Sequence, residues 1–182
     1  EAQKEAVESL NGPLLVLAGA GSGKTRVLTH RLANLLASGI TNPWNIMAIT
    51  FTRKAASEMR DRVNALLGTV SRGIWIGTFH HVCVRILRAN ASRIGFSDQF
   101  TIYDTDNTKR LVSSILDDLH INSKAFTPNS VRAKISAYKN SLLVPGKVEI
   151  LSPVDDVAVK VYEQYQKRLR ELNAMDFDDL LM

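Results

Sequence analysis

One segment near the start of the chain joins an apolar run, a glycine-rich loop and a helical pattern without interruption. The apolar residues 14–17 (LLVL) lead into residues 18–25 (AGAGSGKT), after which valine and leucine recur at helical spacing. A continuous apolar run bounded by glycine is typical of a strand buried in a parallel sheet. Gly19, Gly21 and Gly23 permit the positive φ angles of a tight loop. The segment therefore predicts a strand over residues 14–18, a loop and a helix, which together form a unit of an α/β fold.

The residue types in this loop indicate what it binds. Its spacing matches G-x-x-x-x-G-K-[ST], except that Ala18 stands at the first position. In such loops backbone N–H groups converge on phosphate oxygens at a helix N-terminus, the lysine reaches the β- and γ-phosphates, and the hydroxyl ligates Mg²⁺. We therefore expect a nucleoside triphosphate with Mg²⁺ as the ligand, with Lys24 and Thr25 as catalytic residues and Thr25 as the metal ligand. The residues expected to contact the nucleotide here are Ala18, Gly19, Ala20, Gly21, Ser22, Gly23, Lys24, Thr25 and Arg26.

Length and cysteine usage limit the class of protein. At 182 residues the chain suits one α/β domain or a domain with an insertion. Its one cysteine, Cys83, excludes an internal disulfide framework and fits a reducing compartment. No apolar run approaches membrane-spanning length, and no signal-peptide pattern precedes the first apolar run. We therefore expect a cytoplasmic protein with no membrane contact.

Basic side chains are concentrated in the first half of the chain. The net charge is +5, and residues 1–91 carry 11 Lys and Arg against 5 Asp and Glu. Residues 92–182 carry 12 against 13. A basic excess beside the glycine-rich loop is compatible with nucleic-acid binding, although charge alone is a weak indicator.

Strand and helix patterns alternate up to about residue 90, and helical patterns dominate afterwards. Short apolar stretches predict strands at residues 45–50, 74–76 and 100–103. Helical periodicity and start and stop signals predict a helix that begins at about residue 26 and stops near Ser38-Gly39. They also predict helices at residues 54–67, 79–90, 111–119, 128–138 and 152–169. Alternation of this kind implies a parallel sheet over residues 14–90, followed by a mostly helical insertion.

Four segments, read together with the loop, resemble a known family. Residues 48–59 (AITFTRKAASEM) and 77–88 (GTFHHVCVRILR) look like motifs Ia and Ib of the UvrD/Rep/PcrA superfamily-one DNA helicases. Residues 175–181 (MDFDDLL) resemble the segment that closes their insertion subdomain, and residues 3–7 (QKEAV) resemble their Q motif. The resemblance extends over essentially the whole chain, in order and in spacing.

The resemblance implies an α/β fold with a P-loop RecA-like parallel sheet and a mostly helical insertion subdomain. Residues 1–90 would form part of a motor domain, residues 91–174 the insertion, and residues 175–182 the return to the motor domain. It implies ATP and Mg²⁺ as cofactors, with Gln3 selecting adenine. Translocation would run 3′ to 5′ along single-stranded DNA. The expected partners are single-stranded DNA, single-strand/double-strand junctions and the remaining domains of the same polypeptide.

The family's DNA path carries over onto positions that follow two of the expected strands. The residues implied to contact DNA are Phe51, Thr52, Arg53, Lys54, Thr78, Phe79 and His80. An aromatic ring offers a stacking surface to any base, and basic side chains meet phosphates. The family commonly has Asn where this chain has Arg53, which leaves the role of that position open.

The family's Asp-Glu-x-Gln motif and second motor domain do not occur within the 182 residues. We therefore expect this chain to be an N-terminal part of a helicase that by itself does not hydrolyse ATP at a useful rate. Alternatives are the motor part of a helicase–nuclease, a P-loop kinase, and a non-catalytic nucleic-acid-binding module. A glycine-rich turn followed by a chance Lys-Thr pair is disfavoured by the flanking patterns.

Several other polar residues have structural interpretations. We expect His80 and His81 to make polar contacts at a helix N-terminus, and Cys83 to pack in an apolar stripe. Asp104 or Asp106 suits a helix cap. The remaining charged pairs are expected to be solvated: Lys109-Arg110, Asp117-Asp118, Asp155-Asp156, Lys167-Arg168 and Asp178-Asp179. For the two basic pairs, contact with duplex phosphate is the alternative.

Overall fold

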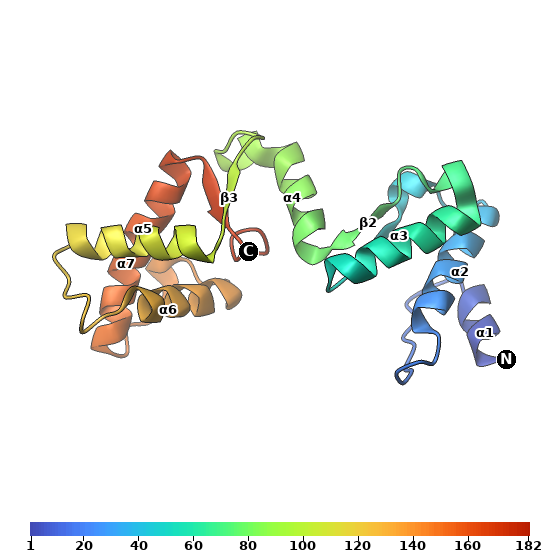
Figure 1. Cartoon of the computed structure of the whole chain (residues 1–182), viewed down its shortest axis with the longest axis horizontal. Helices are drawn as coiled ribbons and strands as arrows, with labels where there is room; N and C mark the ends of the chain where they lie inside the picture. The colour runs from blue at the N-terminus through green and yellow to red at the C-terminus, as the bar shows by residue number, and fades with distance from the viewer. The chain divides into compact units, whose positions relative to one another are not determined.

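The computed structural model describes residues 1–182 as a mixed α/β chain that divides into two compact units, Glu1–Val82 and Cys83–Met182 (Figure 1). The α-helices are α1 (Ala2–Glu8), α2 (Lys24–Ala37), α3 (Arg53–Leu67), α4 (Phe79–Asn90), α5 (Thr105–Asp118), α6 (Pro128–Asn140) and α7 (Pro153–Glu171). The strands are β1 (Met47–Thr50), β2 (Trp75–Thr78), β3 (Thr101–Tyr103) and β4 (Ala174–Asp176). Short 3₁₀ helices are η1 (Pro43–Asn45), η2 (Gly68–Ser71), η3 (Ala91–Ile94) and η4 (Pro145–Lys147).

In the first unit, α3 connects two parallel strands. β1 and β2 pair in register from Met47 opposite Trp75 to Thr50 opposite Thr78. The hydroxyl of Thr52 caps α3 by accepting the Ala55 N–H, and the helix ends at Gly68, whose φ of 56° favours glycine. The unit's core packs α2 and α3 against the strands and consists of Leu32, Ala48, Met59, Val63 and Ile76.

The prediction of a strand over residues 14–18 is wrong for this structure. These residues have no strand partner, because β1 and β2 pair only with each other. The side chains of Leu15 and Leu17 are 81% and 86% exposed. An apolar run becomes a buried strand only where a neighbouring strand satisfies its backbone and a helix covers its side chains.

The second unit packs three helices beside a second parallel pair of strands. β3 and β4 pair in register from Thr101 opposite Ala174 to Tyr103 opposite Asp176. α5, α6 and α7 each begin at a side-chain cap, from Asp104, Thr127 and Ser152 respectively. The main core lies between these helices and consists of Val112, Ile115, Leu116, Val131, Ile135, Val161, Tyr162, Tyr165, Leu169 and Ala174.

The two compact units divide inside α4, after Val82, whereas the expected boundary lies at residue 90. Residues 174–182 lie within the second unit, where Met175 and Leu180 pack with Ala91 and Phe100. Strand β4 was not expected, since three residues between a helix and a turn give almost no periodic signal. None of the helices combines the length and the apolar character needed to span a bilayer.

Candidate nucleotide site and nucleic-acid surface

The glycine-rich loop turns sharply into α2. Gly21 and Gly23 have φ angles of 75° and 85°, in the left-handed region where residues with a side chain are strained. Gly19 lies outside that region. The Ser22 hydroxyl donates to the Gly19 carbonyl at 2.6 Å and closes the loop on itself. The expectation of positive φ is thus confirmed at two of the three glycines.

The start of α2 presents hydrogen-bond donors that have no partner within the chain. Gly23 precedes the helix without a side-chain cap, and no backbone or side-chain group accepts the N–H groups of Gly23, Lys24 and Thr25. The Lys24 ammonium donates to the carbonyls of Ala18 and Gly19, at 2.9 and 2.6 Å. A cation and unpaired N–H groups at a helix N-terminus form an arrangement suited to an oxyanion.

The residues present fit a Mg²⁺ ion held mainly by phosphate. The Thr25 hydroxyl, in the first turn of α2, has no hydrogen-bond partner within the chain, so its oxygen is free to ligate. No group of three or more His, Cys, Asp or Glu side chains gathers to hold a metal ion. Mg²⁺ commonly keeps several waters and takes few protein ligands beside phosphate. The Thr25 hydroxyl is therefore compatible with a Mg²⁺ ion whose other ligands are phosphate and water.

Gln3 lies against the loop although 19 residues separate it from Ser22. Its Nε2 donates to the Ser22 carbonyl at 2.8 Å. A Cβ added at Gly23 would lie 3.0 Å from the same nitrogen, so Gly23 also makes room for the amide. A cavity of about 270 Å³ lies beside them, between α1 and α2, and is lined by Gln3, Lys4, Val7, Glu8, Arg26, Val27 and His30.

Two phenylalanines meet at one edge of the first sheet. Phe51 follows β1 and Phe79 follows β2, and because the strands are parallel and in register, both residues leave the sheet at the same end. Their ring centroids are 5.5 Å apart with an interplanar angle of 49°. Phe51 is 90% exposed. Phe51 therefore does not belong to the core of the first unit.

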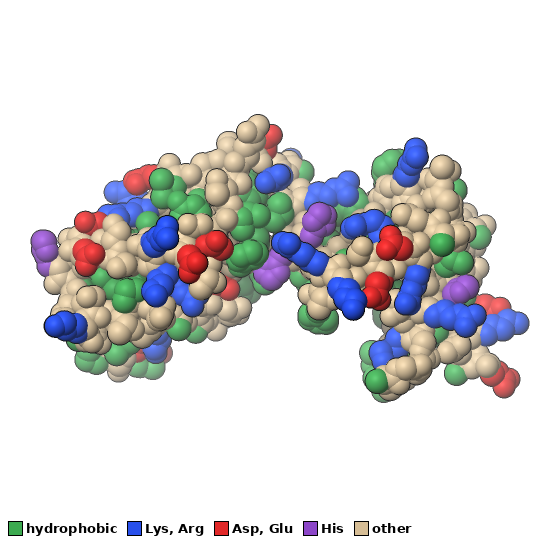
Figure 2. Space-filling model, viewed as in Figure 1, with side chains coloured by type: hydrophobic (Ala, Val, Ile, Leu, Met, Phe, Trp, Pro, Cys, Tyr) green, Lys and Arg blue, Asp and Glu red, His purple; other side chains and the backbone are tan.

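The other residues expected to contact nucleic acid are neighbours of these two phenylalanines in the sequence, after the end of β1 and around the end of β2. The Thr52 hydroxyl caps α3, and Arg53 and Lys54 are exposed in the first turn of that helix. Figure 2 shows Lys and Arg side chains along α3, interspersed with acidic ones. Thr78 and His80 are half-buried at the start of α4, where the Thr78 hydroxyl accepts the His81 N–H at 3.3 Å.

Sequence reasoning missed a buried ion cluster in the second unit. Lys139 is 1% exposed, and its ammonium lies 2.8 Å from Asp176 and 2.7 Å from Asp179. The Tyr165 hydroxyl also donates to Asp176, at 2.7 Å. Lys139 continues the apolar stripe of Val131 and Ile135 at intervals of four residues, which is the signal that would have found it.

The electrostatics of the cluster follow from its burial. Burial disfavours the charged form of Asp176, but the ammonium and hydrogen bonds of Lys139 outweigh it and hold the pKa of that carboxyl below its usual range. Burial and the adjacent Asp176 raise the pKa of Tyr165. Burial, followed by the charges of Asp179, Asp176 and Asp178, raises the pKa of Tyr162 to about 12. Both tyrosines are therefore neutral hydrogen-bond donors over the physiological range.

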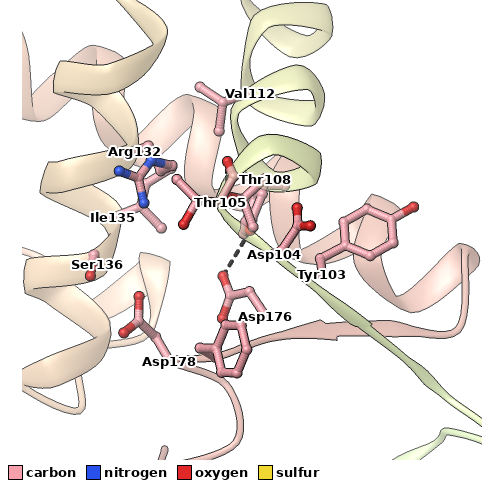
Figure 3. A pocket seen from close by; sticks show the side chains of 12 residues that line it. Tyr103, Asp104, Thr105, Thr108, Val112, Arg132, Ile135, Ser136, Asp176 and Asp178 are labelled. Carbon is pink, nitrogen blue, oxygen red and sulfur yellow. Dashed lines mark hydrogen bonds between the residues drawn. The ribbon is translucent and has the colours of Figure 1, made fainter.

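A cavity of about 150 Å³ adjoins this cluster (Figure 3). Arg132, Ser136 and Asp178 lie on one side of it, and Asp104 and Thr105 lie on the other. The Nε atom of Arg132 is buried without a hydrogen-bond partner. Asp104 also caps α5 by accepting the Asn107 N–H, which confirms the capping role expected for it.

Two of the acidic pairs expected to be solvated are corrected by the structure. Asp179 is bound to Lys139, and Asp155 is buried at the start of α7. Asp155 accepts hydrogen bonds from Lys134, Tyr138 and Ser152, and these lower the pKa of its carboxyl. Arg168, expected on a solvated face, pairs with Asp118. Cys83 packs beside Val84 and Leu87, as expected.

We expect acid to remove the contribution of Asp155 to stability. Because its folded pKa is depressed, that contribution is complete above the unfolded value of about 4 and is lost as the pH falls toward the folded value. Asp155→Asn should therefore lower the thermal midpoint of the second unit at pH 7, and lower it by a smaller amount at pH 2.5, where part of the contribution is already lost. Near-ultraviolet circular dichroism of the tyrosines measures this. The exposed Asp106→Asn is the control, and an equal loss at both pH values would contradict the assignment.

The geometry defines the class of protein: a mixed α/β chain with a glycine-rich Lys-Thr loop at a helix start and an exposed aromatic pair at a parallel-sheet edge. The family described as "UvrD/REP helicase N-terminal domain" matches residues 1–182, and the chain belongs to this family.

The chain is similar to curated members of the family from several bacteria. It is 48% identical to the ATP-dependent DNA helicase PcrA of Bacillus subtilis (strain 168) over 182 residues. It is 47% identical to that of Staphylococcus aureus (strain NCTC 8325 / PS 47) and 48% identical to that of Staphylococcus epidermidis (strain ATCC 35984). Each alignment covers 99% of this chain and 25% of the relative, so the chain spans about a quarter of the length of these proteins.

Proposed function

We propose that these residues are the ATP-binding and single-strand-binding part of a 3′–5′ DNA helicase of the UvrD/Rep type. Residues 1–90 belong to a RecA-like motor domain, residues 91–174 form its insertion subdomain, and residues 175–182 begin the return. The observation that carries the proposal is that one unit holds both the loop with unpaired N–H donors and the aromatic pair. The similarity to PcrA helicases supports the same function. The protein works in the cytoplasm, on single strands and at single-strand/double-strand junctions.

In the nucleotide site each residue has one task. Lys24 leaves the carbonyls of Ala18 and Gly19 and binds the β- and γ-phosphates of ATP, while the first N–H groups of α2 hold phosphate oxygens. Thr25 ligates Mg²⁺, which when bound neutralises charge on the phosphate oxygens. Gln3 reads adenine. These 182 residues contain no Asp-Glu-x-Gln run to activate water, and we propose that alone they bind ATP without turning it over.

In the nucleic-acid site Phe51 and Phe79 stack on bases, and the neighbouring donors bind phosphate. Stacking is independent of sequence because every base has a π-face, and Arg53 and Lys54 supply charge in the adjacent helix turn. Thr52, Thr78 and His80 are the polar members of this surface. A helicase has to bind every sequence it meets, which is what such a surface provides.

We expect Phe51→Ala to weaken binding of a single-stranded oligonucleotide. Loss of one stacking ring costs about 1 to 3 kcal/mol per base, or about 5- to 150-fold in affinity. Phe51 is almost fully exposed, so the fold and the thermal midpoint should be unchanged. Fluorescence anisotropy with a labelled oligothymidylate measures the affinity.

Phe51→Trp is the matched control, because it keeps a stacking ring and should retain binding. Leu151→Ala, at an exposed apolar position of the second unit, tests whether any exposed hydrophobic residue has the same effect. Equal binding by wild type and Phe51→Ala would remove this surface from the proposed function.

A further inference from the structure

Helix α1, which carries Gln3, has little apolar packing of its own. It has seven residues, and of these only Ala6 is buried. Isolated helices shorter than about 12 residues are marginal in water, so other contacts have to hold this one in place. The position of Gln3 therefore depends on what binds the remainder of α1.

Two side chains of α2 bind the C-terminal end of α1. The guanidinium of Arg31 donates through Nη1 to the carbonyl of Ala6 at 2.8 Å and also to the carbonyl of Ser9. The Nδ2 of Asn34 donates to the carbonyl of Val7 at 3.1 Å. These carbonyls lie where a helix leaves its backbone acceptors without intrahelical partners. Arg31 and Asn34 are three residues apart, so they lie on the same face of α2.

The other end of this assembly sets the orientation of the Gln3 amide. The Ser22 carbonyl can only accept a hydrogen bond, so it takes the amide nitrogen and leaves Oε1 and one N–H of Gln3 unspent. An acceptor beside a donor complements the N6 amino group and N7 of adenine. Guanine presents O6 and N7, two acceptors, along the same edge, so its O6 would face Oε1.

We propose that Arg31 and Asn34 are positioning residues for adenine recognition. By holding α1 on α2 they keep the Gln3 amide on the Ser22 carbonyl, in the orientation that accepts adenine and rejects guanine. The inference rests on the proposed adenine-reading role of Gln3. It assigns base selectivity to two residues that do not line the cavity between α1 and α2.

The test compares wild type with the double variant Arg31→Met/Asn34→Ala. Ribose-labelled fluorescent ATP is displaced by ATP, by GTP and by inorganic tripolyphosphate, all with Mg²⁺. We expect wild type to prefer ATP over GTP, and the double variant to bind ATP about tenfold more weakly, with the preference largely lost. Tripolyphosphate affinity should stay within about twofold, because tripolyphosphate has no base to be read.

Three further variants isolate the cause. Arg62→Met removes an arginine from an exposed ion pair on α3 and should leave the ATP/GTP ratio unchanged. Arg31→Lys keeps a hydrogen-bond donor at position 31 and should retain part of the wild-type ATP/GTP affinity ratio. Asn34→Ala alone removes one hydrogen bond, and should shift the ratio in the same direction by less while the fold is kept.

The possible results separate this inference from the function on which it rests. A double variant that keeps the wild-type ratio would overturn the positioning role and leave Gln3 as the reader of adenine. Equal weakening of ATP and tripolyphosphate would also overturn it, because the two residues would then support the loop as a whole. A wild type with no preference for ATP would reject the role of Gln3 itself, and the inference with it.

Discussion

Lys139→Met should destabilise the second unit by about 3 to 5 kcal/mol, the cost typical of breaking a buried ion pair by removing one partner. The variant leaves Asp176 and Asp179 without the ammonium that lies 2.8 and 2.7 Å from them. It also removes a cation 4.9 Å from the centre of the Tyr165 ring. Since α6 and the segment after β4 are joined through this cluster, residues 174–182 should lose their fixed position.

The distribution of chromophores makes the measurement specific. All four tyrosines, at positions 103, 138, 162 and 165, lie in the second unit, and both tryptophans, Trp44 and Trp75, lie in the first. Tyrosine circular dichroism during urea unfolding should therefore show the loss, while tryptophan fluorescence excited at 295 nm should keep the wild-type transition.

Two variants serve as controls for the cluster. Lys160→Met removes a lysine that pairs with Asp156 at 2.7 Å but is 61% exposed, and should cost no more than about 0.5 kcal/mol. Lys139→Met combined with Asp176→Asn and Asp179→Asn removes the uncompensated charges and should recover part of the loss. A Lys139→Met protein as stable as wild type would show that the cluster is not fixed in solution.

Lys24→Ala should weaken binding of ATP with Mg²⁺ by about 30-fold or more, because a hydrogen bond between charged groups contributes about 2 kcal/mol or more. The ammonium now rests on the exposed carbonyls of Ala18 and Gly19, which water can satisfy in its absence. The variant should therefore fold as wild type does, and the loss can be assigned to the phosphate contact.

Titration of ribose-labelled fluorescent ATP measures this loss, and Lys167→Ala is the control. Lys167 is exposed in the second unit and pairs with Glu171 one helical turn away, so its removal should not change the affinity for ATP. Phosphate release from ATP can be measured on the same samples, and we expect no ATP hydrolysis with or without oligonucleotide. Unchanged ATP affinity in Lys24→Ala would favour a non-catalytic module with a vestigial loop.

Local signals predicted most of the helices of this chain correctly. Thr127-Pro128 and Ser152-Pro153 mark the starts of α6 and α7, and the expected helix at 79–90 coincides with α4. These signals succeed because capping and helical periodicity depend on residues within one or two turns of each other. Expected strands at 45–50 and 74–76 also occur, with shifts of one to two residues at their ends.

The failures concern residues whose partners are distant in sequence. Residues 14–17 have the composition of a buried strand, but a strand exists only with a neighbour, and none pairs with them here. Asp155 looked like a solvated helix charge because Lys134 and Tyr138, which bind it, belong to another helix. Periodicity within one segment contains no information on such partners.

By itself the sequence determined the family and predicted the chemistry of the loop, because Gly23, Lys24 and Thr25 are consecutive and the motifs are linear. Only the tertiary structure decided that Phe51 and Phe79 face each other, since that follows from the register of β1 and β2. It also decided that Lys139 is buried between two carboxylates and that Gln3 rests on Ser22. These contacts join residues 19 to 40 positions apart, and packing free energy, rather than local propensity, selects them.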